Sequence, residues 1–414
     1  MEIKNINTIL AVCIVIGLVT SFLLVIQKPL YVDEIAHYYV ISSFCSFDYS
    51  KVPDFLPQIP GYHFFAGLFG WLSNCSEAGI RLFTLLLSFA SIFVAFKLSE
   101  AIGIGIVDKR LKVLVYILLP ILFPYFFLIY TDVISLLFIL LMFYFLVKEN
   151  YPASALFGAL GFVVRQNNIL WVLFSIVYVL IGKSGKIGPN KLKEVFSPGF
   201  IKKVLPYIIV LLIAAAFFIK NGGFAIGGKG EHPALSFSMM NIYTALFYFF
   251  WLNAPDNIAN LKTIRKKVMG FDRKRLLVVL FAIALFFSFF LFTFKITHIW
   301  NQYPEYGYFF RNALLGFFDS SFILRSVLFL CILYSVMSLW TLKTSDRRMY
   351  LFYIFSAIFL GSSWLIESRY FLIPFVMTNL LAVREKMVEK RLIIWYLIVT
   401  VVYMYFWLSG QTFW

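Results

Sequence analysis

Residues 276–294 read LLVVLFAIALFFSFFLFTF, a run that contains no charged residue. About 20 consecutive apolar residues form a helix long enough to cross the ~30 Å hydrocarbon core of a bilayer. Comparable stretches recur along the chain, and we count about thirteen predicted spans, within a range of about 12–14. They fall near residues 7–27, 79–99, 111–130, 132–147, 151–165, 168–182, 204–220, 235–252, 276–296, 322–342, 349–366, 369–383 and 391–409. The sequence therefore predicts an all-α, polytopic membrane protein.

The composition excludes most soluble enzyme classes. Hydrophobic residues make up 62% of the 414 residues and charged residues only 14%, whereas soluble domains are about half apolar and about one quarter charged. The sequence contains no Walker loop, zinc-binding pattern or dinucleotide fingerprint. The glycine-rich stretch at residues 221–230 lacks the Gly-Lys-Ser/Thr that a nucleotide cradle requires. The remaining classes are enzymes and transporters that act at a membrane face.

The basic residues predict an orientation. If the amino terminus is cytoplasmic, the predicted inner segments hold 26 of the 36 Lys and Arg residues and 10 of the 20 Asp and Glu residues. The whole net charge of +16 then lies on the inner side, as the positive-inside bias requires. The basic excess is thus a topology signal, and we do not expect nucleic-acid binding.

The first outer loop, residues 28–78, carries the motif Tyr-Val-Asp-Glu-Ile-Ala-His at residues 31–37. Two adjacent carboxylates, Asp33 and Glu34, stand where the first predicted span ends, and they favour general-base catalysis at the membrane surface. Neighbours on a helix diverge by about 100°, so the two need not share one site. The alternative is an acidic pair that begins an interfacial helix near residues 33–43.

Two of the four cysteines, Cys45 and Cys75, lie in the same first outer loop. An oxidising compartment on that side of the membrane could join them in a disulfide. Cys13 and Cys331 lie within predicted spans.

Other polar residues gather at the predicted outer face. Charged groups at membrane depth are costly and are commonly functional. The alternative for each one is an interfacial side chain that reaches water or pairs with a neighbour. Besides Asp33 and Glu34, the residues are His37, Arg81, Asp132, Arg165, Gln166, Asn167, Lys220, Lys229, Glu231, His232, His298, Asn301, Glu305, Arg311, Glu367 and Arg369.

Several short runs resemble the dolichyl-phosphate-glucose-dependent α-1,2-glucosyltransferase family, and they occur in that family's order. The runs are Tyr31-Val-Asp-Glu with His37, Pro60-Gly61-Tyr62, Tyr130-Thr131-Asp132, Arg165-Gln166-Asn167-Asn168-Ile169 with Trp171, Asn221-Gly222-Gly223 through His232, and Glu367-Ser368-Arg369-Tyr370 with Pro374. The chain departs from the family at Gly227-Gly228, where Gly-Asp is usual, and at residues 300–304, where only Asn301 is kept. These departures bear on donor or acceptor specificity rather than on the class of enzyme.

The resemblance implies a single integral membrane domain over residues 1–414 with the GT-C architecture and a luminal active site in the endoplasmic reticulum membrane. It implies transfer of glucose from dolichyl-phosphate-glucose to the terminal glucose of a diglucosylated dolichyl-diphosphate-linked oligosaccharide, in an α-1,2 linkage. A β-linked donor and an α-linked product imply inversion by one direct displacement. Related enzymes generally work without a metal ion, so we expect neither a metal nor another cofactor.

This chemistry suggests a role for each candidate residue. We expect Asp33 to act as the base, with Glu34 as second choice or as a group that orients the acceptor hydroxyl. Guanidinium groups bind phosphate through parallel hydrogen bonds, which favours Arg369 and Arg165 for the leaving phosphate. Lys229, His232 and Arg311 are weaker candidates for that role or for contacts with the acceptor. Acceptor or sugar contacts are predicted for His37, Asp132, Gln166, Asn167, Asn301 and Glu367.

Two other functions fit the same features. A GT-C enzyme could use another polyprenyl-phosphate sugar, such as a mannose donor. A non-catalytic transporter of lipid-linked sugars would also have many spans and buried polar residues. Transporters carry their polar groups near mid-membrane and often have internal repeats, whereas here the polar runs lie at one face and no repeat is evident.

Overall fold

The computed structural model describes residues 3–53, 56–182, 197–230, 237–302 and 309–410. The α-helices are α1 (Ile3–Val25), α2 (Asp33–Cys45), α3 (Gly61–Trp71), α4 (Glu77–Ala101), α5 (Ile106–Ile117), α6 (Asp132–Val147), α7 (Tyr151–Val164), α8 (Ile169–Ile181), α10 (Pro198–Asn221), α11 (Met240–Leu252), α12 (Ala254–Met269), α13 (Arg273–Thr293), α14 (Ile299–Gln302), α15 (Phe309–Asp319), α16 (Phe322–Thr341), α17 (Tyr350–Gly361), α18 (Leu372–Leu381) and α19 (Lys386–Leu408). Short 3-10 helices are η1 (Tyr49–Lys51), η2 (Phe123–Phe126), η3 (Gln166–Asn168), η5 (Arg347–Met349) and η6 (Ser368–Phe371).

Apolar helices dominate this architecture. Five helices of the described residues, α4, α10, α13, α16 and α19, are long and apolar enough to cross a membrane. Five shorter apolar helical stretches accompany them: Val12–Val25, Asp132–Val147, Tyr151–Val164, Gln166–Ile181 and Met240–Leu252. The prediction of an all-α, polytopic membrane protein is confirmed in its helical, multi-pass character.

Three predicted spans need correction. The stretch 111–130 is not one helix, because α5 ends at Ile117 and only the short η2 follows. Pro120 and Pro124 lie in this stretch, and proline removes a backbone donor and breaks helices. The predicted spans 349–366 and 369–383 are also shorter than expected, as α17 and α18. The chain is not purely helical, since β1 (Lys343–Thr344) pairs antiparallel with β2 (Ala382–Val383).

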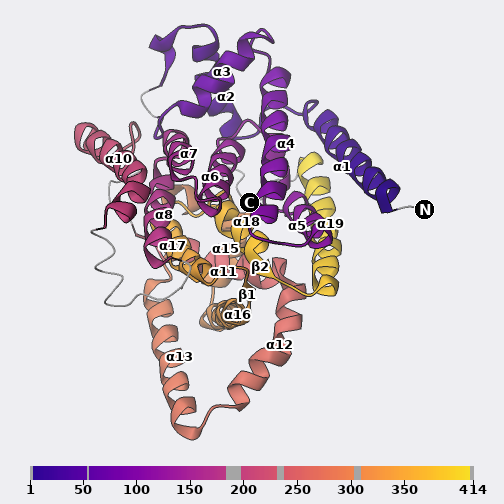
Figure 1. The fold of residues 1–414 in the computed structure, drawn as a ribbon, viewed down its shortest axis with the longest axis vertical. Helices are drawn as coiled ribbons and strands as arrows, with labels where there is room; N and C mark the ends of the chain where they lie inside the picture. Colours follow the sequence, from indigo (N-terminus) through magenta and orange to yellow (C-terminus); the bar gives the residue numbers. More distant parts are fainter. Residues whose placement is uncertain (1–2, 54–55, 183–196, 231–236, 303–308, 411–414) are drawn as a thin grey trace.

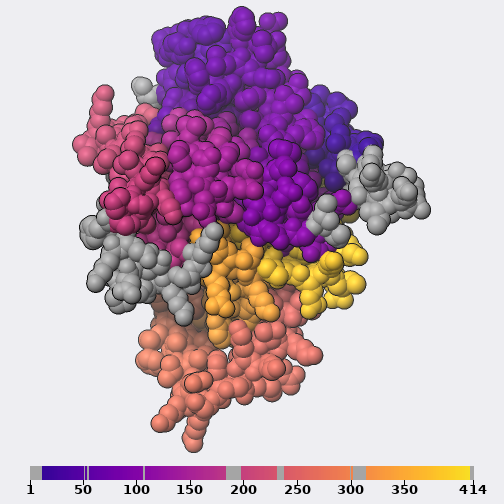
Figure 2. Space-filling view, viewed as in Figure 1, coloured from indigo at the N-terminus to yellow at the C-terminus, as the bar shows by residue number. Residues whose placement is uncertain are grey.

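The helices form a central body with a pair of helices at each of its two ends. In Figure 1, α2 and α3 lie at one end of the molecule and the α12–α13 hairpin lies at the other, and Figure 2 shows the same two ends in space-filling form. Within the body, α6 packs against both α4 and α7. Every residue of α18 is buried, so this short helix lies in the interior.

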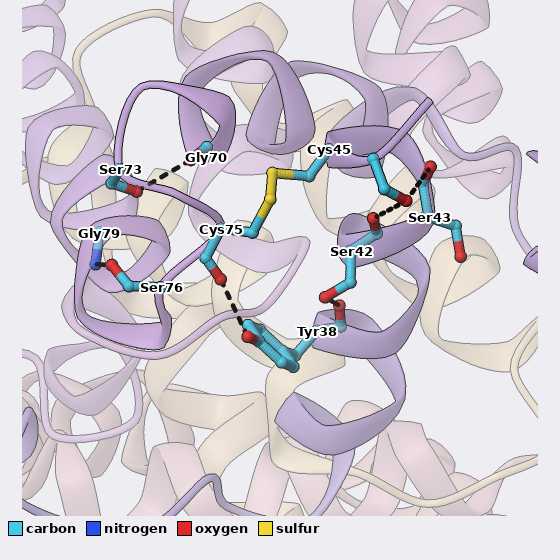
Figure 3. The surroundings of a disulfide bond; sticks show 10 residues. Tyr38, Ser42, Ser43, Cys45, Gly70, Ser73, Cys75, Ser76 and Gly79 are labelled. Carbon is cyan, nitrogen blue, oxygen red and sulfur yellow. Dashed lines mark hydrogen bonds between the residues drawn. A yellow bond between two sulfur atoms is a disulfide. The ribbon is translucent and has the colours of Figure 1, made fainter. Parts of the chain in front are cut away.

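The α2–α3 cap is held by close packing and a disulfide. A Cβ placed on Gly67 of α3 would lie 2.6 Å from the Cβ of Phe44 in α2, so the two helices approach as closely as they do because this residue is glycine. Figure 3 shows the bond between Cys45, at the end of α2, and Cys75, after α3. The Tyr38 hydroxyl also donates to the Cys75 carbonyl at 2.9 Å. The possible Cys45–Cys75 pairing is therefore present.

A cluster of buried polar side chains lies among residues predicted to be on the inner side. Lys112 of α5 pairs with Glu389 of α19 at 2.5 Å, and both side chains are buried. Arg384 pairs with Asp256 of α12 at 2.7 Å. Lys112 also donates to the Asn379 carbonyl at the end of α18. These contacts join the middle of α5 to the ends of α12, α18 and α19, at a face distinct from that of the first outer loop.

Candidate active site

Asp33 and Glu34, the predicted catalytic pair, occupy different environments at the start of α2. The Glu34 side chain is fully buried and accepts four hydrogen bonds. Its Oε2 accepts from Arg81 Nη2 at 2.6 Å and from the Tyr31 amide at 2.8 Å. Its Oε1 accepts from Arg81 Nε at 3.0 Å and from the Ile129 amide at 2.8 Å. The structure therefore separates this carboxylate from solvent.

Arg81, in α4, completes this buried contact. Its Nη1 donates to the carbonyls of Val25 and Lys28 at 2.9 and 2.8 Å, and its Nη2 donates to that of Pro29 at 3.1 Å. The guanidinium thus binds the carboxyl end of α1 and the turn after it, in addition to Glu34. These contacts fix where α2 begins relative to α1 and α4.

Asp33, in contrast, is partly open and faces the carboxyl-terminal part of the chain. Its Oδ2 lies 2.7 Å from Arg369 Nη1, and its side chain is 34% exposed. Arg369, in η6, also pairs through Nε with Glu367. The structure thus brings together three predicted site residues from opposite ends of the chain.

A second arginine, Arg165, belongs to the same cluster. Arg165, which precedes η3, donates from Nη2 to Asp132 Oδ2 at 3.0 Å and from Nε to Thr131 Oγ1 at 2.9 Å. Its guanidinium lies 5.8 Å from the ring centre of Tyr370, and that of Arg369 lies 5.7 Å from the same ring. The two guanidiniums therefore lie around one tyrosine, with three carboxylates as partners.

His37 lies one turn after Asp33 in α2 and is paired with His63 of α3. The distance from His37 Nδ1 to His63 Nε2 is 3.0 Å, and both rings are buried. The His37 ring meets that of Tyr130 edge-on with centroids 5.6 Å apart. Burial, and then the positive charges of Arg369 and Arg165, lower the pKa of His37 to about 3. His37 is thus neutral at working pH.

The polar turn at residues 165–168 joins two loops to the cluster. Gln166 Nε2 donates to the carbonyls of Pro57 and Phe224 at 3.1 and 3.2 Å. Asn167 is half-buried beside it. Lys229, exposed in the glycine-rich loop, donates to the Asn221 carbonyl at 2.6 Å. The first outer loop and the loop after α10 therefore meet at this turn.

Asn301, another predicted residue, binds the backbone segment that precedes Glu367. It both donates to and accepts from the backbone of Ile366, at 3.0 and 2.9 Å. Asn241 of α11 binds the same segment, through the carbonyls of Ser363 and Leu365 and the amide of Glu367. Asn241 and His63 were missing from the predicted site, and Arg81 was predicted to lie at the outer face without a role in the site. Each has a visible signal, a polar side chain within or beside an apolar stretch.

Two predicted residues cannot be placed in the site. His232 lies outside the described residues. The backbone of Arg311 belongs to α15, but its side chain lies outside the description. Among the residues that are described, no three His, Cys, Asp or Glu side chains form a group able to hold a metal ion, and the expectation of metal-free chemistry stays a prediction.

Together, these features define a multi-pass helical membrane protein with a cluster of ion-paired carboxylates and arginines where its first loop meets its last helices. The sequence profile of the DIE2/ALG10 family matches residues 27–407. The chain belongs to that family.

Relatives with an assigned activity extend this result. A human protein named Dol-P-Glc:Glc(2)Man(9)GlcNAc(2)-PP-Dol alpha-1,2-glucosyltransferase is 23% identical, over 88% of this chain and 86% of its own length. The Drosophila melanogaster protein of that name is 25% identical, over 84% and 83%. The mouse protein is 26% identical, over 60% of this chain and 61% of its own length. No solved structure matches significantly.

Proposed function

We propose that the chain transfers glucose from dolichyl-phosphate-glucose to the terminal glucose of the diglucosylated dolichyl-diphosphate-linked oligosaccharide, in an α-1,2 linkage. The family match over residues 27–407 supports the class of reaction. The observation that carries the mechanism is the partly exposed carboxylate of Asp33, 2.7 Å from the Arg369 guanidinium. This pair places a base beside a phosphate-binding group.

The proposal includes the architecture and the location of the protein. Residues 1–414 form one GT-C-type membrane domain with about thirteen spans, a cytoplasmic amino terminus and a luminal site in the endoplasmic reticulum. The ion pairs support this two-sided arrangement. Arg81–Glu34 and Arg369–Asp33 join predicted outer residues, whereas Lys112–Glu389 joins predicted inner residues. The disulfide in the first outer loop is in keeping with an oxidising lumen.

In the proposed reaction, Asp33 is the general base. The acceptor hydroxyl oxygen attacks the anomeric carbon of the donor glucose, and its proton passes to the Asp33 carboxylate. The bond between that carbon and the phosphate oxygen breaks at the same time, and its electron pair leaves with dolichyl phosphate. One displacement inverts the configuration, so no covalent sugar–enzyme intermediate forms.

Arg369 and Arg165 are proposed to hold the phosphate. The phosphodiester carries one negative charge and gains a second as the bond breaks, so fixed cations stabilise the transition state more than the bound donor. A guanidinium has five N–H donors. Arg369 uses Nη1 for Asp33 and Nε for Glu367, which leaves N–H groups for a phosphate oxygen. The phosphate of bound dolichyl-phosphate-glucose would then compete with the Asp33 carboxylate for Arg369 and free that carboxylate to act as the base.

The remaining candidates take supporting parts in this proposal. Glu34, being buried against Arg81, orients the start of α2 rather than accepting the proton. Asp132 and Glu367 hold the two arginines in place. Asn301 fixes the backbone before Glu367. The other contacts with the acceptor or the phosphate are proposed for His37, Gln166, Asn167, Lys229, His232 and Arg311.

A transfer assay with the whole protein in liposomes tests the proposal. The donor is dolichyl-phosphate-glucose, the acceptor is the diglucosylated lipid-linked oligosaccharide, and the product is scored by mass for one added hexose. Asp33→Asn should abolish transfer. Asp319→Asn is the matched control, because Asp319 also forms an exposed pair with an arginine, Arg325, at 2.7 Å, yet has no part in the cluster.

Three other results would contradict the proposal in different ways. Transfer from a mannose donor alone would leave the fold proposal intact and overturn the choice of sugar. Passage of labelled lipid across the bilayer without any transfer would favour a transporter. Full activity in Asp33→Asn would show that another residue takes the proton.

A further inference from the structure

The buried contact between His37 and His63 has a direction that the chemistry of the two rings determines. A neutral imidazole has one N–H donor and one acceptor nitrogen. His37 Nδ1 and His63 Nε2 lie 3.0 Å apart, so one carries the proton and the other accepts it. Both rings stay neutral, because burial lowers the pKa of each.

The second nitrogen of His63 decides between the two arrangements. His63 Nδ1 is buried and has no hydrogen-bond partner among the described residues. If that nitrogen carried the proton, a buried N–H would be left unpaired, which is rarer in proteins than an unpaired acceptor. The favoured arrangement therefore protonates His63 on Nε2, and this N–H donates to Nδ1 of His37.

That arrangement fixes the tautomer of His37. With Nδ1 acting as acceptor, the proton of neutral His37 must be on Nε2. Asp33 and His37 are four residues apart on α2, so they lie on the same face. Helical side chains lean toward the amino terminus, which brings the His37 ring toward Asp33. The ring also contacts Tyr130, whose own ring lies 5.8 Å from the Arg369 guanidinium.

We propose that His63 is a positioning residue that holds His37 in the Nε2–H tautomer, so that His37 presents a hydrogen-bond donor beside Asp33 to an oxygen of the bound sugar. This inference rests on the proposed function for its substrate, but the tautomer itself does not depend on activity. The packing of α3 on α2 thereby sets the chemistry of a residue in the site.

The tautomer can be measured directly. The chain has only four histidines, so ¹⁵N- and ¹³C-histidine labelling of the whole protein in liposomes gives a simple solid-state NMR spectrum. The signals lost in His37→Asn identify His37. We expect the Nε2–H form in the parent protein and a mixture of both forms in His63→Leu. Finding the Nδ1–H form in the parent would overturn the proposal.

Kinetics then separate positioning from a merely structural role. His63→Leu should lower kcat about tenfold with little change in the donor KM, the scale of one weakened transition-state hydrogen bond. His63→Gln, whose amide can donate near the position of Nε2, should restore kcat to within about threefold of the parent. Tyr62→Phe is the matched control, because Tyr62 is buried beside both rings but leaves their nitrogens unchanged.

The outcomes are distinguishable. Equal losses in His63→Leu, His63→Gln and Tyr62→Phe would reduce His63 to a packing residue and refute the proposal. A parent protein that transfers no hexose but has the Nε2–H form would overturn the proposed function, and it would refute the substrate contact while preserving the assigned tautomer.

Discussion

Replacing Glu34 with glutamine should destabilise the protein rather than remove its catalytic base. The carboxylate accepts from two nitrogens of Arg81 and from the amides of Tyr31 and Ile129, all within 3.0 Å. In Glu34→Gln, one oxygen becomes an NH₂ group that faces donors, and the positive charge of Arg81 loses its partner in a buried site.

The geometry sets the size of the effect. Removing one member of a buried ion pair costs about 3–5 kcal/mol. The side chains of Glu34 and Arg81 are 0% and 1% exposed, so solvent screening is small here. We therefore expect a loss of about 3–5 kcal/mol in the free energy of unfolding, which is a large part of the stability of most proteins.

Denaturant unfolding in mild detergent, followed by tryptophan fluorescence, measures this loss. Glu100→Gln is the control, since Glu100 also pairs with basic residues but its side chain is 46% exposed, and exposed pairs contribute little. The transfer rate is then measured per folded molecule, at a temperature where the variant remains folded.

Two results would refute this reasoning. A Glu34→Gln protein as stable as the parent would mean that the buried pair contributes little to the fold. A Glu34→Gln variant that is folded but transfers no sugar, together with an Asp33→Asn variant that still transfers it, would mean that Glu34, rather than Asp33, takes the proton.

Three further predictions concern other parts of the protein. Arg369→Lys keeps the charge but loses the guanidinium fork, so initial-rate assays should give a kcat about 100-fold lower; an unchanged kcat would exclude a role in phosphate binding. Replacing Cys45 and Cys75 with serine should reduce the stability to unfolding by about 3–4 kcal/mol through the lost loop constraint, and a reductant should then affect only the parent. Folding lowers the pKa of His37 from 6.5 to about 3, so the unfolded chain binds more protons than the folded chain between these pH values. The free energy of unfolding should therefore decrease as pH falls through that window, by at most about 1.4 kcal/mol per pH unit from this residue. His37→Gln should flatten the dependence of unfolding free energy on pH, measured by denaturant unfolding at several pH values. An equal slope in the variant and the parent would contradict the assignment of a neutral His37.

The apolar helices could be predicted because a bilayer imposes a length on each one. The stretch 111–130 misled that reasoning, since its composition fits a span while Pro120 and Pro124 prevent a continuous helix. The strand pair of β1 and β2 depends on contacts between residues about 40 positions apart, such as Lys343 and Val383. Hydropathy carries no information about such contacts.

The site could be predicted as a group of residues but not as a set of pairs. Polar side chains at helix ends identified Asp33, Arg165 and Arg369, and the structure joins Asp33 with Arg369. Helix geometry allowed Asp33 and Glu34 to face different environments, but which of the two is buried could not be predicted, because adjacent carboxylates look alike until their partners are known. The partner of Glu34, Arg81, lies 47 residues away in an otherwise ordinary helix.

The pairing of Asp33 with Arg369 has a consequence for synthesis of the protein. The disulfide of the cap formed by α2 and α3, and the Arg81–Glu34 pair that anchors it, join residues from the first part of the chain. The arginine opposite the proposed base is made hundreds of residues later. Synthesis therefore completes Asp33 and its cap long before the arginine that completes the site, and we expect a product truncated before η6 to transfer no sugar.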